Sequence, residues 1–326
     1  MKSMLTIANK SNSMDFLEFA YQNGVRDFRV NMAYEDDALC AIDKLRTLPK
    51  DIRVFIDYPA EKQRILFADK ASEKNFGIAD EVRLSVWDKG EFYITNTLGM
   101  LSRIQTGHHI SFADGKVIGN VICKNNSEII IKILKAGILR NNAGCCFVGN
   151  GVPSPAISPK YCQSILQSPP LLQNNGFMTW VILSFVSDAK SIEEFVAEMH
   201  KRSILVMAKI ETPDGVNQMQ EISCIADGIL IGRGDLKNIS GEAYGNVYQK
   251  ALENFSKLPQ TQYKGIGTFF LLKYAMTKAL EESEITDLKD AQKYKSDFVM
   301  FSKEVVNSNY PRETVTIANK IIAREV

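Results

Sequence analysis

Histidine is scarce in this sequence, and its cysteines do not follow a metal-binding spacing. Only three histidines are present, which argues against a histidine-based zinc site and against a catalytic triad with a histidine base. The six cysteines include the adjacent pair Cys145 and Cys146, which fits neither a CxxC metal knuckle nor an ordinary disulfide framework. We therefore expect reduced thiols and a cytoplasmic location.

Strong charge of one sign and long apolar runs are also missing. The 39 basic and 38 acidic side chains give a net charge of +1 at pH 7, and no basic run suggests a nucleic acid partner. No apolar run approaches the ~20 residues of a membrane-spanning helix, and the first residues lack the apolar core of a signal peptide. We therefore expect neither nucleic acid nor membrane as a partner, and the oligomeric state, a homo-oligomer included, stays open.

The sequence does contain enough apolar material for a large core, arranged in alternating strands and helices. Of its 326 residues, 45% are hydrophobic and 24% are charged, which is ordinary for a globular protein with one large domain, or one domain plus an insert. Strand-like runs at residues 4–7, 27–31 and 53–57 are separated by helical spacing at residues 14–22 and 38–48. This βαβαβ order favours a parallel sheet.

The pattern changes between residues 65 and 155. Short runs rich in β-branched residues follow one another there, with turns at Asp88-Lys89-Gly90 and Ala113-Asp114-Gly115 and without long helical stretches. A stretch rich in proline, glycine and serine, residues 149–170, would return the chain to the first domain. We therefore expect a small all-β domain at residues 65–155, inserted after the third strand of a domain formed by residues 1–64 and 156–326.

Alternation resumes after the insert and points to a barrel. Strand-like runs follow at residues 179–184, 204–210, 228–233, 263–268 and 297–301. Helical spacing separates them, including one helix expected over residues 271–282. Without the insert the chain is close to the ~250 residues of a (β/α)₈ TIM barrel, the expected α/β fold. A doubly wound open sheet is the alternative, but no glycine fingerprint supports it.

Polar residues with catalytic chemistry follow most of the expected barrel strands. Because the carboxyl ends of parallel strands meet at one rim, these residues are candidates for a single site. They are Arg29, Asn31, Asp57, Lys209, Glu211, Arg233, Asp235, Thr268, Ser302 and Glu304. An isolated charge after a strand is usually only the point where the chain meets water. Residues of this kind at most of the strand ends of one barrel indicate a site.

The residue types at this rim suit a metal ion and an anionic substrate. Glu211 and Asp235 offer hard oxygen ligands for Mg²⁺ or Mn²⁺. Lys209 would place a point charge beside that metal, and Arg29 offers a bidentate fork to a phosphate.

Several segments of the chain resemble the pyruvate kinase family. The pair Lys209-Ile210-Glu211 and Arg233-Gly234-Asp235-Leu236 is similar to the family's metal-binding K-I-E and R-G-D-L segments. FRVNMAYED resembles A-R-x-N-F-S-H-G, and IDYPAEKQR resembles L-D-T-K-G-P-E-I-R. IGTFFL resembles A-T-Q-M-L, and Ser302-Lys303-Glu304 with Tyr310-Pro311 resembles S-G-E-T followed by Y-P. The matches keep the family's order along the chain.

The resemblance implies a barrel with a lid that closes over phosphoenolpyruvate and a nucleotide. By position, Glu211 and Asp235 would bind Mg²⁺ or Mn²⁺, Lys209 would stabilise the phosphoryl group in transfer, and Arg29 and Arg64 would hold phosphates. Thr268 would lie near the carbon that is protonated, and Ser302 and Glu304 would belong to the proton relay. The remaining substrate-binding positions would be Asn31, Asp57 and the backbone of Arg233, Gly234 and Asp235.

Other positions depart from the family pattern. Ala33 and Tyr58 replace a serine and a threonine of its monovalent-cation site, and Lys62 stands where cation-independent members carry lysine. An ammonium group can substitute for K⁺, so we expect no K⁺ requirement.

Further departures concern the phosphoryl acceptor and regulation. Tyr34 replaces a histidine, and Asn142 and Ala143 stand where the lid usually offers basic residues, which weakens the case for ADP as the acceptor. The sequence ends at the last expected barrel helix, without a counterpart of the family's C-terminal domain, so control through that domain is not expected.

We expect a Mg²⁺-dependent, pyruvate kinase-like phosphotransferase acting between phosphoenolpyruvate or pyruvate and a nucleotide (ADP or ATP) or another acceptor. The first alternative is a metal-dependent enolate enzyme for 2-oxo acids, of the aldolase or decarboxylase type, on the same barrel. The second is a degenerate ligand-binding homologue. The two carboxylates and Lys209, kept together, favour an enzyme over the last alternative.

Overall fold

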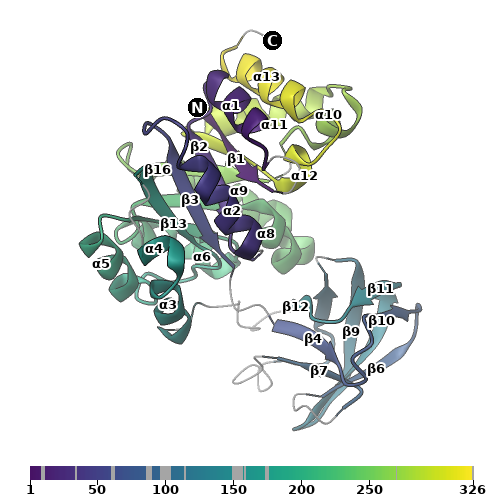
Figure 1. Cartoon of the computed structure of the whole chain (residues 1–326). Coiled ribbons are helices and arrows are strands. Elements are labelled where there is room, and N and C mark those ends of the chain that lie inside the picture. Colours follow the sequence, from purple (N-terminus) through teal and green to yellow (C-terminus); the bar gives the residue numbers. More distant parts are fainter. Residues whose placement is uncertain are drawn as a thin grey trace. The chain divides into compact units, whose positions relative to one another are not determined.

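The structure of the chain is a computed structural model that forms two compact units (Figure 1). It describes residues 1–8, 12–33, 35–59, 63–85, 90–95, 104–113, 115–148, 157, 159–172, 176–268 and 270–324. The first unit comprises Met1–Ala60, Ile157–Gly234 and Gly245–Val326, and the second comprises Glu61–Ala156 and Asp235–Tyr244.

The first unit is a closed barrel of eight parallel strands, which confirms the expected α/β barrel. The order around the barrel is β1-β17-β16-β15-β14-β13-β3-β2. The strands are β1 (Lys2–Ile7), β2 (Asp27–Asn31), β3 (Arg53–Tyr58), β13 (Met178–Leu183), β14 (Leu205–Ile210), β15 (Gly228–Gly232), β16 (Tyr263–Gly267) and β17 (Phe298–Phe301). Most residues of each strand are buried, because the barrel interior covers one face and helices cover the other.

Helices follow the barrel strands along the chain (Figure 1), and of their residues Asp235–Tyr244 group with the second unit. They are α1 (Met14–Gln22), α2 (Glu35–Leu45), α3 (Pro159–Leu166), α4 (Pro169–Leu172), α5 (Glu193–Lys201), α6 (Pro213–Asn217), α7 (Met219–Ser223), α8 (Arg233–Ser240), α9 (Tyr244–Ser256), α10 (Leu272–Thr277), α11 (Glu282–Lys293), α12 (Lys303–Val306) and α13 (Pro311–Ile322). A short 3₁₀ helix, η2 (Gly241–Ala243), separates α8 from α9.

Local sequence signals explain where several helices begin. The Ser13 hydroxyl accepts a hydrogen bond from the Phe16 amide at 3.2 Å and caps α1. The Thr212 hydroxyl caps α6 by accepting from the Gly215 amide at 3.0 Å, and Pro213 occupies the first helical position. Both arrangements satisfy amide groups that a helix N-terminus leaves without an intrahelical partner.

One helix expected from the sequence is two helices in the structure. Residues 271–282 have helical spacing, but α10 ends at Thr277 because Lys278 adopts a left-handed conformation with φ of +62°. The separate helix α11 then begins at Glu282. Its low content of apolar residues hid it from a reading based on hydrophobic spacing.

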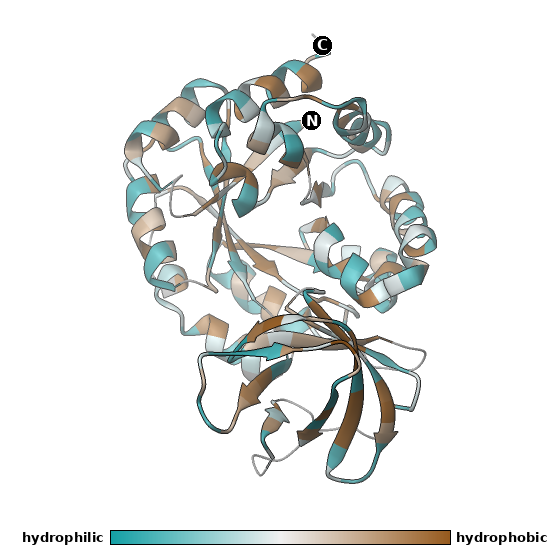
Figure 2. Cartoon of the chain, turned by 90° about the vertical axis from the view of Figure 1, so that its right-hand side faces the viewer, coloured by the Kyte–Doolittle hydropathy of each residue, from teal (hydrophilic) through white to brown (hydrophobic). Residues whose placement is uncertain are grey.

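Large apolar side chains fill the interior of the barrel. Hydrophobic residues concentrate along the strands, whereas the helices also carry hydrophilic residues (Figure 2). The buried cluster consists of Met4, Phe55, Trp180, Ile182, Met207, Leu230, Phe298 and Met300. Phe55 stacks on Trp180 with ring centroids 5.4 Å apart. Gly265 is required opposite this layer, because a Cβ there would lie 2.2 Å from the Phe298 ring.

A buried polar network closes the amino end of the barrel. Asp27 and Arg53 begin β2 and β3, and the Arg53 guanidinium donates to both Asp27 carboxylate oxygens at 2.6 and 2.8 Å. The Tyr263 hydroxyl, at the start of β16, donates to Asp27 at 2.5 Å. Burial together with the Asp27 charge raises the pKa of the Tyr263 phenol, so this hydroxyl stays protonated.

Between residues 63 and 148, the described part of the second unit consists of β-strands with their own core, and the unit's other segment, Asp235–Tyr244, contains most of α8 and η2. The closed sheet of the unit has the strand order β10-β6-β7-β4-β12-β8-β9, and β11 pairs with β5 in a two-stranded sheet. The strands are β4 (Gln63–Phe67), β5 (Glu73–Phe76), β6 (Glu81–Ser85), β7 (Phe92–Ile94), β8 (His109–Phe112), β9 (Val117–Lys124), β10 (Glu128–Lys135), β11 (Gly137–Arg140) and β12 (Ala143–Val148). Phe67, Phe76 and Phe92 are buried together in the core of this unit.

Among the helices that the structure describes, none has the length and apolarity needed to cross a bilayer.

Candidate active site

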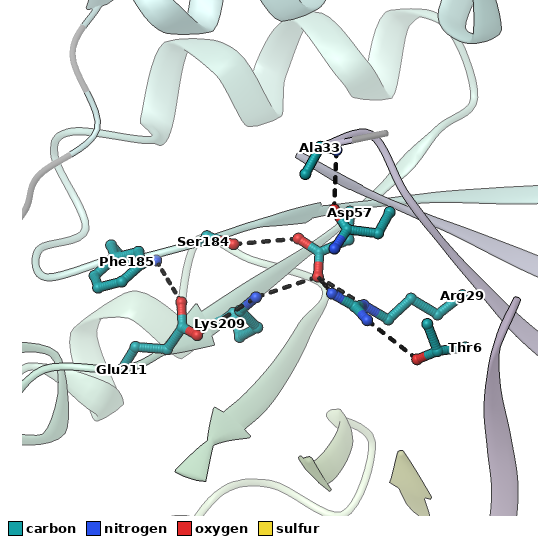
Figure 3. A network of polar contacts seen from close by, with 9 residues as sticks. Thr6, Arg29, Ala33, Asp57, Ser184, Phe185, Lys209 and Glu211 are labelled. Atoms are coloured by element: carbon teal, nitrogen blue, oxygen red, sulfur yellow. Dashed lines mark hydrogen bonds and ion pairs between the residues drawn. The ribbon is translucent and has the colours of Figure 1, made fainter. Parts of the chain in front are cut away.

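Asp57, near the end of β3, is the centre of a polar network at the carboxyl ends of the barrel strands (Figure 3). Its carboxylate is 1% exposed. The Oδ2 atom accepts from Arg29 Nε at 2.7 Å and from Lys209 Nζ at 3.1 Å. The Oδ1 atom accepts from the Ser184 hydroxyl at 3.1 Å. Neighbouring strands supply these groups, because β2 and β13 pair with β3, and β14 pairs with β13.

The network keeps Asp57 ionised although the carboxyl group is buried. Burial alone would raise its pKa, but the positive charges of Lys209 and Arg29 outweigh this effect and hold the pKa of Asp57 below its ordinary value. The carboxylate in turn neutralises part of the positive charge that these two side chains bring into the barrel. The arrangement is a buried charge cluster in which each charge has a partner.

Glu211 extends the network along β14. Lys209 and Glu211 are two residues apart, so their side chains leave the strand on the same side. Lys209 Nζ lies 3.4 Å from Glu211 Oε1, and Glu211 Oε2 accepts a hydrogen bond from the Phe185 amide at 3.1 Å. Gly232, on neighbouring β15, provides the space for this carboxylate, because a Cβ at that position would lie 2.6 Å from Glu211 Cγ.

Thr6 connects this network to a cavity. Its hydroxyl accepts from Arg29 Nη1 at 3.1 Å. It also lines a cavity of about 540 Å³ together with Ile7, Ala8, Asn31, Asp37, Ala38, Met276, Lys303, Glu304, Asn307, Ser308 and Asn309. That volume lies within the range of small-molecule sites, roughly 300–1,000 Å³. The Ser308 hydroxyl oxygen is buried and has no hydrogen-bond partner among the described residues.

Two predicted site residues are thereby placed on the cavity, and a third lies next to them. Asn31 and Glu304 line it. Ser302 immediately precedes α12, to which Glu304 belongs. The Asn31 side-chain carbonyl accepts from the Ala33 amide at 3.0 Å, which holds the turn after β2.

Arg233 and Thr268 form a second group, on the β15 and β16 side of the barrel. The buried Arg233 side chain donates to the Gly267 carbonyl at 3.1 Å and also to the Thr268 carbonyl. It forms an ion pair with Asp287 at 2.6 Å. The Thr268 hydroxyl is thus held in a segment that Arg233 supports, and Gly234 and Asp235 follow Arg233 in α8.

The structure does not bring all predicted residues to one place. Arg64 belongs to the second unit, where its Nη1 donates to the Asn142 carbonyl at 2.9 Å. Asp235 also groups with the second unit, whereas Glu211 belongs to the first. The Lys62 and Tyr34 predictions lie outside the described residues.

Sequence reasoning missed Thr6, Ser184 and Asp287. A usable signal exists for the first two. Met4 and Ile182 face the barrel interior, and Thr6 and Ser184 come two residues later, as Asp57 follows Phe55 and Lys209 follows Met207. Asp287 lies on α11, which the hydrophobic pattern did not predict, so no comparable signal was available for it.

The donor set suits a hard divalent cation that keeps several ligands from water or substrate. Within the described parts of the chain, no group of three or more histidine, cysteine, aspartate or glutamate side chains is placed to hold a metal ion. Mg²⁺ commonly uses only one or two carboxylates and completes its shell with water and substrate phosphates. Glu211 is ionisable, oxygen-donating and nearly buried, which fits that requirement.

Comparisons with known proteins agree with the resemblance seen in the sequence. The family model described as "Pyruvate kinase, barrel domain" matches residues 1–315. The chain is 25% identical over 347 residues to a pyruvate kinase of Staphylococcus saprophyticus, covering 99% of this chain and 57% of that relative. It is 24% identical to a pyruvate kinase of Agrobacterium vitis, covering 99% of this chain and 69% of that protein.

A solved structure shares the fold. A pyruvate kinase from Cryptosporidium parvum superposes with a TM-score of 0.84 at 20% identity, covering 99% of this chain and 68% of the other. The chain spans little more than half the length of the staphylococcal relative. Because the family model covers nearly the whole sequence, the chain belongs to the pyruvate kinase family and corresponds to its barrel domain.

Proposed function

We propose that the protein is a Mg²⁺-dependent phosphotransferase acting between phosphoenolpyruvate or pyruvate and a nucleotide or other acceptor. The observation that carries this proposal is the buried cluster of Arg29, Lys209, Asp57 and Glu211. Two cations and two carboxylates share a few ångströms of space at the carboxyl ends of β2, β3 and β14. Such a cluster is costly to bury and has little structural use at a rim where the loops of (β/α)₈ enzymes form active sites.

Arg29 and Lys209 would hold and stabilise the transferring phosphoryl group. Both contact Asp57 Oδ2, so their donors already point to one region of space. An incoming phosphate would draw on the remaining donors of Arg29 and Lys209 while Asp57 keeps the two side chains in position. Preorganised positive charge of this kind lowers the barrier because it needs no reorientation during the reaction.

Glu211 and Asp235 would hold Mg²⁺ or Mn²⁺. When bound, the ion would supply positive charge to the phosphoryl oxygens and to the enolate oxygen. Glu211 is oriented for this role by the Phe185 amide, which donates to one carboxylate oxygen. The other oxygen, at 3.4 Å from Lys209, would exchange that ammonium group for the cation and leave Lys209 available to the substrate.

Protonation of the enolate carbon would take place on the β16 and β17 side. Thr268 follows β16, and Ser302 and Glu304 follow β17. The backbone of Arg233, Gly234 and Asp235 would bind the substrate carboxylate at the start of α8. Arg64 would contribute to phosphate binding.

The protein would work without a monovalent cation. The Asp57 charge is already balanced by two side-chain cations. Asn31 is engaged by the Ala33 amide, and the buried Tyr58 hydroxyl is engaged by the Ser168 hydroxyl. Other groups of the chain therefore already contact Asp57, Asn31 and Tyr58. The lysine expected from the sequence to replace K⁺, Lys62, lies outside the described residues.

The cavity beside Thr6 is the proposed site of the phosphoryl acceptor. It adjoins the network through Thr6, which both lines the cavity and accepts from Arg29. An acceptor seated there would have one end near the transferring group. The unpartnered Ser308 hydroxyl would contribute a hydrogen bond to it.

The charge of this cavity also supports the alternative of 2-oxo-acid enolate chemistry. Its lining carries one basic residue, Lys303, and two acidic residues, Asp37 and Glu304. This is a weak environment for a polyphosphate. An enzyme that cleaves or condenses a 2-oxo acid would use Lys209, the metal and Thr268 without needing a nucleotide at all.

The test is an activity assay with phosphoenolpyruvate, Mg²⁺ and a panel of nucleoside diphosphates, in which the formation of pyruvate is measured. Lys209→Met should lower kcat at least 100-fold, because one preorganised charge at a reacting centre contributes about 10²–10³. Lys257→Met is the matched control and should leave kcat unchanged, because this exposed lysine lies between α9 and β16, before the amino end of a strand. Oxaloacetate or aldol turnover without any nucleotide would instead favour the alternative, and no turnover of either kind would reject both.

A further inference from the structure

Arg233 and Asp287 lie beneath the segment that carries Thr268, and their contacts go beyond what packing requires. We infer that these two side chains are positioning residues that fix the Thr268 hydroxyl for the protonation of the enolate carbon. This inference rests on the proposed function, since Thr268 has that role only if an enolate is formed.

The backbone of the Thr268 segment has an unusual conformation. Thr268 has a φ of +66°, and Leu271 has a φ of +50°. Left-handed conformations are disfavoured for residues with a Cβ, and more so for a β-branched residue such as threonine. The chain therefore needs surrounding contacts to keep Thr268 in this geometry.

Arg233 supplies most of those contacts. Its guanidinium donates to the carbonyls of Gly267 and Thr268, which belong to the peptide units immediately before and after the strained residue. The guanidinium carbon also lies 4.0 Å from the centre of the Phe270 ring. A single side chain thus contacts the segment before, at and after Thr268.

The Thr268 hydroxyl is directly coupled to this arrangement. The Gly267 carbonyl accepts one hydrogen bond from Arg233 Nε at 3.1 Å and another from the Thr268 hydroxyl at 2.8 Å. Both donors meet at one oxygen atom. A displacement of Arg233 therefore changes the electrostatic environment of the same oxygen that orients the hydroxyl.

Asp287 fixes Arg233 in turn. Its carboxylate accepts from Arg233 Nη1 at 2.6 Å. Asp287 belongs to α11, and Glu284, one turn earlier on that helix, accepts from the amides of Lys273 and Tyr274 at 2.8 and 3.2 Å. Helix α11 therefore holds both ends of the segment, through Asp287 and Arg233 before it and through Glu284 after it.

The support of the left-handed Thr268 backbone by Asp287 can be tested by thermal unfolding, without an activity assay. In a double-mutant cycle, Asp287→Ala should lower the Tm of the otherwise unchanged protein by about 2–4 °C. The same substitution should cost clearly less in a Thr268→Gly background, because glycine adopts a positive φ without strain and needs the support less. An equal Tm decrease in both backgrounds would overturn the inference, whatever the protein catalyses.

The role in protonation is tested by incubating the protein in deuterium oxide with pyruvate, Mg²⁺ and inorganic phosphate. NMR then measures the incorporation of deuterium at the methyl carbon of pyruvate. Asp287→Ala should lower this exchange about 10- to 100-fold, since small misplacements of a reacting group have effects of this size. The KM values for phosphoenolpyruvate and Mg²⁺ should stay unchanged, and Asp287→Glu should recover part of the exchange. Glu313→Ala, which removes the exposed partner of Lys278, is the control.

Different results would contradict the proposed function and the positioning role of Asp287. If the unaltered protein neither turns over phosphoenolpyruvate nor exchanges the protons of pyruvate, the proposed function is wrong, and the double-mutant cycle still decides whether Asp287 supports Thr268. If the unaltered protein is active and Asp287→Ala lowers exchange and raises both KM values together, the residue acts on general folding and the positioning role is overturned.

Discussion

Arg29 and Lys209 donate to the same oxygen atom, Oδ2 of Asp57, at 2.7 and 3.1 Å. Two cationic side chains from different strands thus depend on one buried carboxylate. Removing that carboxylate affects both at once, whereas removing either cation leaves the other paired. This asymmetry makes Asp57 the most sensitive position in the network.

Asp57→Asn should destabilise the protein strongly. The substitution removes the carboxylate that Arg29 pairs with and leaves Lys209 with Glu211 alone, and breaking a buried ion pair in this way typically costs about 3–5 kcal/mol. Urea unfolding of the unaltered protein and of the variant measures the change in the free energy of unfolding. Asp51→Asn removes an ion pair on the surface, between Asp51 and Arg26, and should have little effect. Equal effects of the two substitutions would contradict the account of the cluster.

The contribution of Asp57 should depend on pH in a defined direction. Its pKa is lowered in the folded protein, so its stabilising effect is present above the pKa of an unfolded aspartate, about 3.9, and is lost as the pH falls through the lower folded value. The difference in unfolding free energy between the unaltered protein and Asp57→Asn should be constant from pH 7 to about 5 and shrink as the pH falls below about 4. A difference that grows toward acidic pH would have the wrong sign.

Gly232→Ala should weaken binding of the divalent cation while leaving the barrel folded. The new Cβ would lie 2.6 Å from Glu211 Cγ and 2.8 Å from Oε1, so the carboxylate must move. Displacing a metal ligand or its support typically costs about 10- to 100-fold in affinity, which Mg²⁺ titration by calorimetry would measure. Gly245→Ala is the matched control, because a Cβ there meets no atom within 4 Å. Unchanged Mg²⁺ affinity in Gly232→Ala would argue against Glu211 as a ligand.

Replacing K⁺ by tetramethylammonium should not change the rate. The charge of Asp57 is balanced by Arg29 and Lys209, so no further cation is required near it. Initial rates at constant ionic strength, with each chloride salt in turn, provide the measurement. A several-fold loss of activity without K⁺ would show that a cation site exists despite the Ala33 and Tyr58 replacements.

Much of the barrel and part of its rim follow from the sequence for simple physical reasons. Most strands are buried on both faces, so they are short runs rich in apolar residues. Helices separate these runs along the chain. Lys209, Glu211 and Asp57 stand out because so many strand ends of this chain carry residues with catalytic chemistry. The barrel then brings them together, since β3 and β14 lie on either side of β13.

Other features depend on information that a one-dimensional pattern does not contain. The alternation along β1 and β13 indicates that Thr6 and Ser184 face the same side as Met4 and Ile182, but it does not indicate that they contact Arg29 and Asp57. The support of Thr268 combines a left-handed backbone with an arginine from the preceding strand end and an aspartate from a polar helix. No periodicity in the sequence indicates that combination.

The aromatic layer inside the barrel has a consequence for the chemistry above it. Phe55 and Met207 lie two residues before Asp57 and Lys209 on the same strands, so the charged groups lie directly above a buried layer of apolar side chains. Water can hydrate them from one side only. A substrate that covers this side would complete their dehydration in a single step, and every electrostatic interaction in the cluster would strengthen at the moment the reactants are enclosed.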